Sequence, residues 1–347
     1  MKMTYRLQNQ LAASSVTLPA ACVAATLLWW LPQGGYSTDY LLGWLACAFT
    51  TYIFLESAAV NALIRIRSRM ISSLFLLLMA AVGFMHPLQA GTLAQCALVL
   101  SLYCLLRTYE NPRPQADTFH TYLLVSLASL LWPPFLLLTF AVLWSQAVYL
   151  RSLGWKSFGA AVIGMILPYI FWASAALVWT GFEPFVQHTA AIISPFTESF
   201  YWQWLVQQVQ TCEWHTFWHV FPAELWRRLS CHMTEGVSLG LVLLFGLTGF
   251  VHYVRKSYDD KIRVRMCHYT YMALQFVLVC WIILQPSSFH MLFPLLLLTT
   301  VPAAAHFIAL THTWLTNAWV VLLLLLLVVV GVYCDAILQL VAGAFIT

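Results

Sequence analysis

Long apolar stretches recur along the chain, and this pattern constrains the fold more than any other feature. In a helix, about 20 mainly apolar residues cross the roughly 30 Å hydrocarbon core of a bilayer. Of the 347 residues, 62% are hydrophobic and 8% are charged, whereas a soluble domain has roughly 25% charged residues. One soluble core cannot bury that excess. The composition therefore excludes a water-soluble globule, a disordered chain and a nucleic-acid-binding protein, and predicts an all-α polytopic protein surrounded by the lipid bilayer.

Nine of these stretches are predicted to form full spans. They lie near residues 16–32, 41–63, 70–87, 91–107, 158–181, 236–254, 268–285, 290–310 and 316–338. A tenth apolar stretch, 119–149, is interrupted by Pro133 and Pro134. A proline pair inside a helix removes backbone donors and clashes with the preceding turn. We therefore predict a bent helical hairpin at 119–149, whose arms either cross the membrane as thin spans or form a re-entrant loop.

The basic residues predict the orientation of the spans, because Lys and Arg concentrate in cytoplasmic loops. With a cytoplasmic N-terminus and the hairpin in place, only Arg227 and Arg228 of the 16 basic residues lie on the outer side. If 119–149 crossed only once, Arg151 and the basic segment 255–265 would also face outward. We therefore expect a single integral domain of the bacterial inner membrane, residues 1–347, with a periplasmic C-terminus.

One long loop, residues 182–235, is predicted on the outer side and is rich in Trp and Phe. Such side chains favour the membrane–water interface. We expect short interfacial helices at 197–211 and 222–231. The loop is then either an anchor that packs over the bundle or a lid over a lipid-linked substrate.

Cysteine and histidine residues cluster inside this outer loop. Cys212, His215 and His219 are spaced along one face of a helix, and Cys231 follows. Three interpretations stay open: a Cys212–Cys231 disulfide in an oxidising periplasm, a zinc site, or unlinked side chains. Of these the zinc site fits least, because the spacing matches no familiar zinc motif, and we expect neither a metal nor a cofactor. His215 and Arg227 either bind a phosphate group or lie at lipid headgroups.

Three polar residues in or near the predicted spans are further candidates. Glu56 lies inside the second span and Asn61 follows it toward the cytoplasm. Ionisable residues in spans are costly and often functional, so Glu56 is either a proton carrier or part of a cation site, or else a structural hydrogen-bonding group. Asp39, in the first outer loop, is either a general base toward a lipid-linked sugar or the N-cap of the next helix.

Part of the chain resembles known membrane proteins. Leu105–Arg107, Leu127–Phe135, Trp155–Lys156 and Gly164–Tyr169 resemble segments of a group of uncharacterised polytopic inner-membrane proteins of Bacteroidota, over about residues 90–175. This resemblance implies an integral inner-membrane protein and brings no activity with it.

A fainter resemblance is to membrane glycosyltransferases that use polyprenyl-phosphate sugars. It would give Asp39 the place of the acidic residue in their first outer loop, although this loop carries no paired acidic motif.

Three functions follow as hypotheses. The first is a non-catalytic subunit or scaffold of a cell-envelope assembly, with other envelope proteins as partners. The second is an envelope enzyme that acts on a lipid or a polyprenyl-linked glycan at the outer face, with Asp39, His215 and Arg227 as catalytic candidates. The third is a transporter in which Glu56 carries protons.

Overall fold

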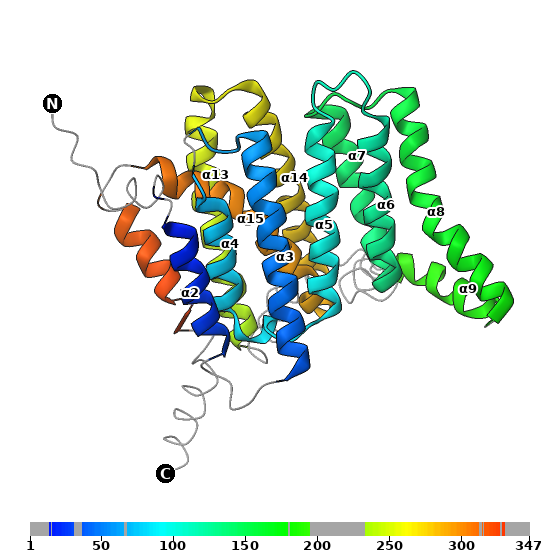
Figure 1. Ribbon diagram of the computed structural model, residues 1–347, viewed down its shortest axis with the longest axis horizontal. Coiled ribbons are helices and arrows are strands. Elements are labelled where there is room, and N and C mark those ends of the chain that lie inside the picture. The colour runs from blue at the N-terminus through cyan, green and yellow to red at the C-terminus, as the bar shows by residue number, and fades with distance from the viewer. Residues whose placement is uncertain are drawn as a thin grey trace, which may run out of the picture. The chain divides into compact units, whose positions relative to one another are not determined.

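The computed structural model describes residues 14, 16–30, 37–65, 68–179, 181–194, 233–311, 314, 316–326 and 328–329 (Figure 1). All regular structure in these segments is helical, which confirms the predicted fold class. Six helices are long and apolar enough to cross a membrane, which supports a polytopic membrane protein. They are α3 (Thr38–Asn61), α5 (Ala90–Arg107), α8 (Trp155–Trp179), α13 (Met233–Lys256), α14 (Ile262–Leu284) and α15 (Phe289–Leu310).

The three other predicted full spans contain shorter helices, so nine complete spans are not confirmed. Helix α2 (Thr17–Trp30) has 14 residues and α4 (Met70–Ala81) has 12. At 1.5 Å per residue α4 is only about 18 Å long. It ends because Val82 adopts an extended conformation and a short 3₁₀ turn, Gly83–Met85, follows. The described part of the last predicted span is the helix Thr316–Leu326.

The chain divides into two compact units. Unit 1 comprises residues 1–92, 229–272 and 297–347, and unit 2 comprises 93–228 and 273–296. Helices α14 and α15 therefore each contribute residues to both units.

Unit 1 is organised around α4, whose sequence is apolar on every side. Eleven of its residues are buried, which is expected of a helix that is hydrophobic all round. Helices α2 and α3 pack against it. Helices α13 and α15 approach each other closely at Gly249, where an added Cβ would lie 2.7 Å from the backbone of Ala303. Small residues allow such close helix crossings in membrane proteins.

The predicted hairpin forms the core of unit 2. Helix α6 (Gln115–Leu131) is followed by a 3₁₀ turn, Pro133–Leu137, and by α7 (Leu138–Val148), and the chain reverses at the proline pair. The arms are joined where the Tyr122 hydroxyl donates to Gln146 Oε1 at 2.8 Å. Figure 1 shows α6 and α7 side by side. The prediction of a reversal at Pro133 is thus confirmed.

The loops that flank the hairpin lie at one end of unit 2. Thr108, after α5, and Ser152, after α7, share a hydrogen bond of 2.8 Å between their hydroxyl groups. The basic residues Arg107, Arg113 and Arg151 belong to these two loops and their borders. The arrangement agrees with the hairpin that the charge distribution predicts.

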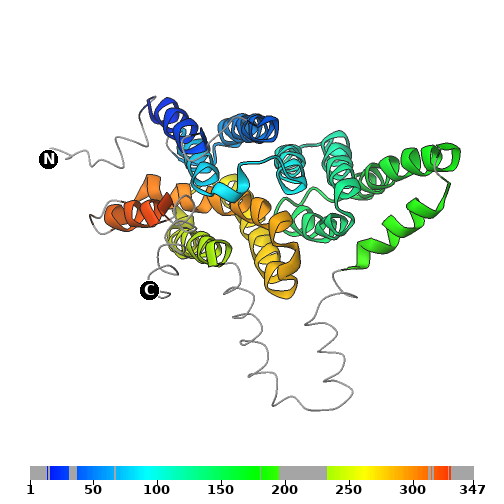
Figure 2. The same ribbon diagram turned by 90° about the horizontal axis from the view of Figure 1, so that it is seen from below.

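Only the beginning and end of the long outer loop are described. Its first part forms α9 (Glu183–Ala190) and a 3₁₀ turn, Ala191–Ile193, and Figure 2 shows α9 leading back from the end of α8. His188 of α9 is hydrogen-bonded through Nε2 to the Ser129 carbonyl at 3.1 Å. The ring of His188 also meets Trp172 edge-on, with centroids 4.4 Å apart. The predicted helices at 197–211 and 222–231 lie outside the described residues.

Candidate functional site

Asp39 lies in the first turn of α3 and is exposed. The N-cap of α3 is Ser37, whose hydroxyl accepts the Asp39 N–H at 3.4 Å. The alternative that made Asp39 the cap is therefore wrong by two residues. A carboxylate in the first turn still complements the positive end of the helix dipole. This position accounts for an acidic residue at 39 without invoking catalysis.

Glu56 is exposed on the outward side of α3. The residues above and below it at helical spacing are exposed as well: Leu41, Leu45, Phe49, Tyr52 and Val60. We call these five residues together with Glu56 the outward stripe. The opposite face of α3 is buried and includes Cys47, Phe54 and Asn61. Ionisable residues in spans usually face the bundle interior or a water-filled cavity, so the outward position of Glu56 is unusual.

Asn61 lies on the buried face of α3 and joins two helices. Its Nδ2 donates to the Ser57 carbonyl at 3.0 Å, and its Oδ1 accepts from an Arg263 guanidinium nitrogen of α14 at 3.1 Å. The structure therefore places Glu56 and Asn61 on different faces and does not bring them together. Asn61 has a structural role, as a hydrogen-bonded link between α3 and α14.

Near Asn61, ionisable side chains from two loops and one helix meet in unit 1. Arg65 follows α3, Asp260 lies between α13 and α14, and His306 belongs to α15. Arg65 Nε lies 2.9 Å from Asp260 Oδ1, and His306 Nε2 lies 3.0 Å from Asp260 Oδ2. The side chains of Asp260 and His306 are fully buried, whereas that of Arg65 is 38% exposed. We call these three residues the polar clasp.

A second set of aromatic and histidine side chains surrounds the polar clasp. The His268 ring stacks on Tyr253 with centroids 4.3 Å apart, and His268 Nε2 donates to the Leu63 carbonyl at 2.8 Å. Tyr253 also meets His306 edge-on, at 4.8 Å. Since a carbonyl can only accept, His268 carries its hydrogen on Nε2, and its Nδ1 is buried without a partner. The ring contacts among Tyr253, His268 and His306 thus join the adjoining ends of α13, α14 and α15.

Two opposing effects determine the electrostatics at Asp260. Burial raises the pKa of the Asp260 carboxyl above its usual value, while the Arg65 guanidinium opposes this by lowering the pKa. The neighbouring carboxylate, Asp259, is 36% exposed and lies 3.7 Å from Arg65. Asp260 therefore holds the buried contacts, and Asp259 only supplements them.

The sequence did not single out the polar clasp. Asp259 and Asp260 lie in the basic segment 255–265, and His306 lies in an apolar span with no carboxylate near it in the sequence. One sequence feature could have predicted the contact between Arg65 and Asp260. The loop that holds Asp260 has two acidic residues among five basic residues, and it lies on the same predicted side of the membrane as Arg65. Opposite charges in two loops on one side of a membrane are natural partners.

His86, at the opposite end of α3 and α4, is also almost fully buried. Its Nε2 donates to the Ala80 carbonyl at 3.0 Å, and its ring stacks on Trp29 of α2 at 4.2 Å. Burial lowers the pKa of His86 to about 4 although the backbone hydrogen bond acts to raise it. His86 is thus a neutral packing residue at neutral pH.

The other predicted site residues lie outside the described part of the chain. They are His215, Arg227, Cys212 and Cys231. The catalytic candidates of the outer loop and the Cys212–Cys231 disulfide therefore stay predictions. Among the residues that the structure does describe, no group of three or more His, Cys, Asp or Glu side chains is placed to hold a metal ion.

Comparisons of this chain with protein-family models, with curated proteins and with solved structures find no match.

Proposed function

We propose that the protein is a non-catalytic subunit of a cell-envelope assembly in the bacterial inner membrane, with its N-terminus in the cytoplasm and its C-terminus in the periplasm. One observation carries the proposal: the outward stripe of α3 presents the carboxylate of Glu56 together with five apolar or aromatic side chains. The stripe is an interaction surface, and its partner is a membrane helix of another protein.

The depth of Glu56 makes lipid a poor environment for it. The apolar run Leu41–Val60 of α3 has the length of one bilayer crossing, and Glu56 lies four residues before its end, about 6 Å below the boundary at 1.5 Å per residue. An acidic group on a lipid-facing surface costs about 2.5–3.5 kcal/mol at the centre of a span and less toward the boundary. A partner that neutralises the carboxylate removes this cost.

The carboxylate in the outward stripe indicates which kind of side chain the partner helix presents to it. A lysine, an arginine or a hydrogen-bond donor at matching depth would satisfy the carboxylate in a low-dielectric environment. Tyr52, one turn away and 63% exposed, adds an aromatic contact of the kind enriched at interfaces. The remaining aliphatic side chains supply packing rather than specificity.

Site-specific photocrosslinking in native membranes tests the proposal. A photoreactive residue at Tyr52 should capture one partner protein at high yield. The same residue at Phe171 of α8, which is 68% exposed, is the matched control and should yield mainly lipid adducts. Glu56→Leu, which removes the charge and suits lipid better, should abolish the adduct at Tyr52 without lowering the amount of protein in the membrane. An unchanged adduct in Glu56→Leu would overturn the proposal, because the carboxylate would then only reach the headgroups.

The polar clasp favours a second candidate function, a proton-coupled transporter in which Asp260 and His306 take the place predicted for Glu56. Carboxylate and histidine side chains in contact form proton relays in transporters. Here the buried Asp260, in the loop between α13 and α14, contacts His306 inside α15. In proteoliposomes with an imposed pH gradient, this candidate requires a proton flux that Asp260→Asn abolishes and Asp259→Asn keeps. No flux with the wild-type protein would exclude it.

A further inference from the structure

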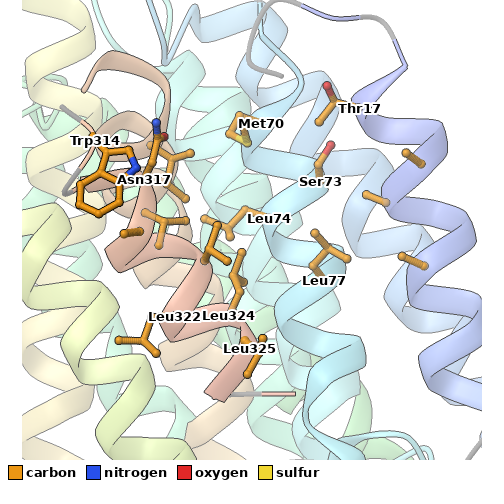
Figure 3. Close-up of a pocket in the computed structure, with 17 residues that line it drawn as sticks. Thr17, Met70, Ser73, Leu74, Leu77, Trp314, Asn317, Leu322, Leu324 and Leu325 are labelled. Atoms are coloured by element: carbon orange, nitrogen blue, oxygen red, sulfur yellow. The ribbon is translucent and has the colours of Figure 1, made fainter. Parts of the chain in front are cut away.

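Not every apolar surface of the molecule identifies what covers it. A groove of about 920 Å³ in unit 1 is lined by α2, α4, the end of α15 and the helix Thr316–Leu326 (Figure 3). Two of its polar lining residues, Thr17 and Ser73, donate their hydroxyl hydrogens to the carbonyls of Ser14 and Arg69. Neither has a hydrogen left to donate to a ligand, so the groove favours no particular occupant. Helix α9 of unit 2 is different, because its sides differ in polarity.

Two of the three sides of α9 are defined by its contacts. One side packs on unit 2 through Phe185 and His188, whose rings lie 5.4 and 4.4 Å from the ring of Trp172, measured between centroids. A second side is exposed and polar, and on it Gln187 donates to the carboxylate of Glu183 at 3.0 Å. This hydrogen bond joins two residues one helical turn apart and keeps both polar groups on the same side.

The third side of α9 is apolar and exposed. Phe182 precedes the helix, Val186 lies within it and Ile193 lies in the 3₁₀ turn that follows, and their side chains are 49%, 45% and 55% exposed. The exposed apolar surface continues beyond Gly181, the corner between α8 and α9, since Trp179 at the end of α8 is 82% exposed. We call Phe182, Val186 and Ile193 the apolar side of α9.

Helix α9 lies at the end of unit 2 opposite the loops that carry the basic residues. Helix α6 starts after one of those loops and has 17 residues, or about 25 Å. The turn that follows it, Pro133–Leu137, therefore lies near the far boundary of a hydrocarbon core roughly 30 Å thick. His188 is hydrogen-bonded to Ser129 in the last turn of α6, and the 3₁₀ turn Ala191–Ile193 packs against Pro133–Leu137. Figure 1 shows α9 running across the direction of α6.

This level, this direction and these sides suit the boundary between lipid and water. A helix that lies in the boundary buries its apolar side among the acyl chains and keeps its polar side in water. The carboxylate of Glu183 opposes burial of its own side, because a charged group in hydrocarbon is costly. Trp179 at the corner supports the same level, since tryptophan is enriched at this boundary.

We propose that α9 binds the surface of the outer leaflet, with its apolar side among the ends of the acyl chains and with Glu183 and Gln187 in water. The lipid surface on α9 is separate from the outward stripe of α3, which contacts another protein. Helix α9 then holds the start of the long outer loop on the membrane, beside the turn of the hairpin.

Fluorescence quenching in proteoliposomes tests this proposal. A dansyl-bearing amino acid is introduced at one site at a time in the full-length protein, which is reconstituted alone into vesicles of phosphatidylethanolamine and phosphatidylglycerol. Bromine atoms on the acyl chains quench a probe in lipid, and iodide on both sides of the membrane quenches a probe in water. Phe171 of α8, which is 68% exposed, is the control for a site that faces lipid. No partner protein is present, so the result does not depend on the outward stripe.

We expect probes at Phe182 and Val186 to be quenched by brominated lipid, as at Phe171, and to be protected from iodide. Probes at Glu183 and Gln187, the matched sites one residue further along, should show the reverse order. The same quenching pattern at Val186 and Gln187 would overturn the proposal, because α9 would then have no lipid side. Protection of the probe at Val186 from both quenchers would overturn it too, because the rest of the outer loop would then cover the apolar side.

Discussion

Asp260 is the residue on which the packing of the polar clasp most depends, and replacing it with alanine gives the sharpest test of the fold. The carboxylate holds His306 of α15 at 3.0 Å and Arg65 at 2.9 Å. Asp260→Ala removes both contacts and leaves a buried ring nitrogen of His306 without an acceptor. The variant should therefore loosen the adjoining ends of α3, α14 and α15.

The magnitude follows from the burial of each contact. A hydrogen bond to a charged group contributes about 1.5–3 kcal/mol, and the contact with His306 is fully buried. The contact with Arg65 is screened because that side chain is 38% exposed, so it adds about 0.2–1 kcal/mol. We expect Asp260→Ala to lower the free energy of unfolding by about 3 kcal/mol in total. Asp260→Asn keeps an acceptor oxygen and should cost about half as much.

Reversible unfolding in mixed micelles with increasing dodecyl sulfate, followed by tryptophan fluorescence, measures these differences. Asp259→Ala is the matched control because its carboxylate is exposed and 3.7 Å from Arg65, and it should cost under about 0.5 kcal/mol. Equal losses in Asp259→Ala and Asp260→Ala would refute the reasoning, since burial would then make no difference. A loss below about 0.5 kcal/mol in Asp260→Ala would refute it as well.

Three further predictions concern other parts of the molecule. Because the pKa of His86 falls to about 4 on folding, the unfolded chain binds a proton at this residue below pH 6.5 that the folded chain does not bind. His86 should therefore account for about 2 kcal/mol of the stability lost between pH 7 and pH 5, and His86→Gln should lose about that much less than the wild type in the same unfolding assay. Gly249→Ala should destabilise the protein by about 1–3 kcal/mol because the added Cβ would meet the backbone of α15. Gly240→Ala, on the same helix, has open space around the added Cβ and should be neutral or stabilising by up to about 1 kcal/mol. If thermal unfolding showed Gly240→Ala to be the less stable of the two variants, the close crossing of α13 and α15 would be contradicted. A cysteine at Arg151 should resist a membrane-impermeant thiol reagent in intact spheroplasts, and labelling there would contradict a hairpin that returns to the cytoplasm.

Local sequence signals predicted much of the fold. The proline pair Pro133-Pro134 and the basic residues on either side of 119–149 were sufficient to predict the reversal, because both act through short-range geometry and charge. The length of α4 was overestimated. An apolar run such as 70–87 reveals hydrophobicity, but not the point at which Val82 leaves the helical conformation.

The candidate site was less predictable because it depends on contacts between distant segments. Glu56 could be recognised from the sequence as an ionisable residue in a span, but which face of α3 would be buried depends on how α3 packs against α4. The polar clasp joins residues 65, 260 and 306, and no local pattern links them. Only the shared predicted side of the two loops that hold Arg65 and Asp260 indicated that these two residues could meet.

The most direct test of the proposed function is native mass spectrometry of the protein released gently from its own membrane. We predict a complex with one other membrane protein at fixed stoichiometry, present in the wild type and lost in Glu56→Leu. A wild-type protein that appears alone, with lipid as its only companion, would contradict the proposal that the outward stripe of α3 is a subunit interface.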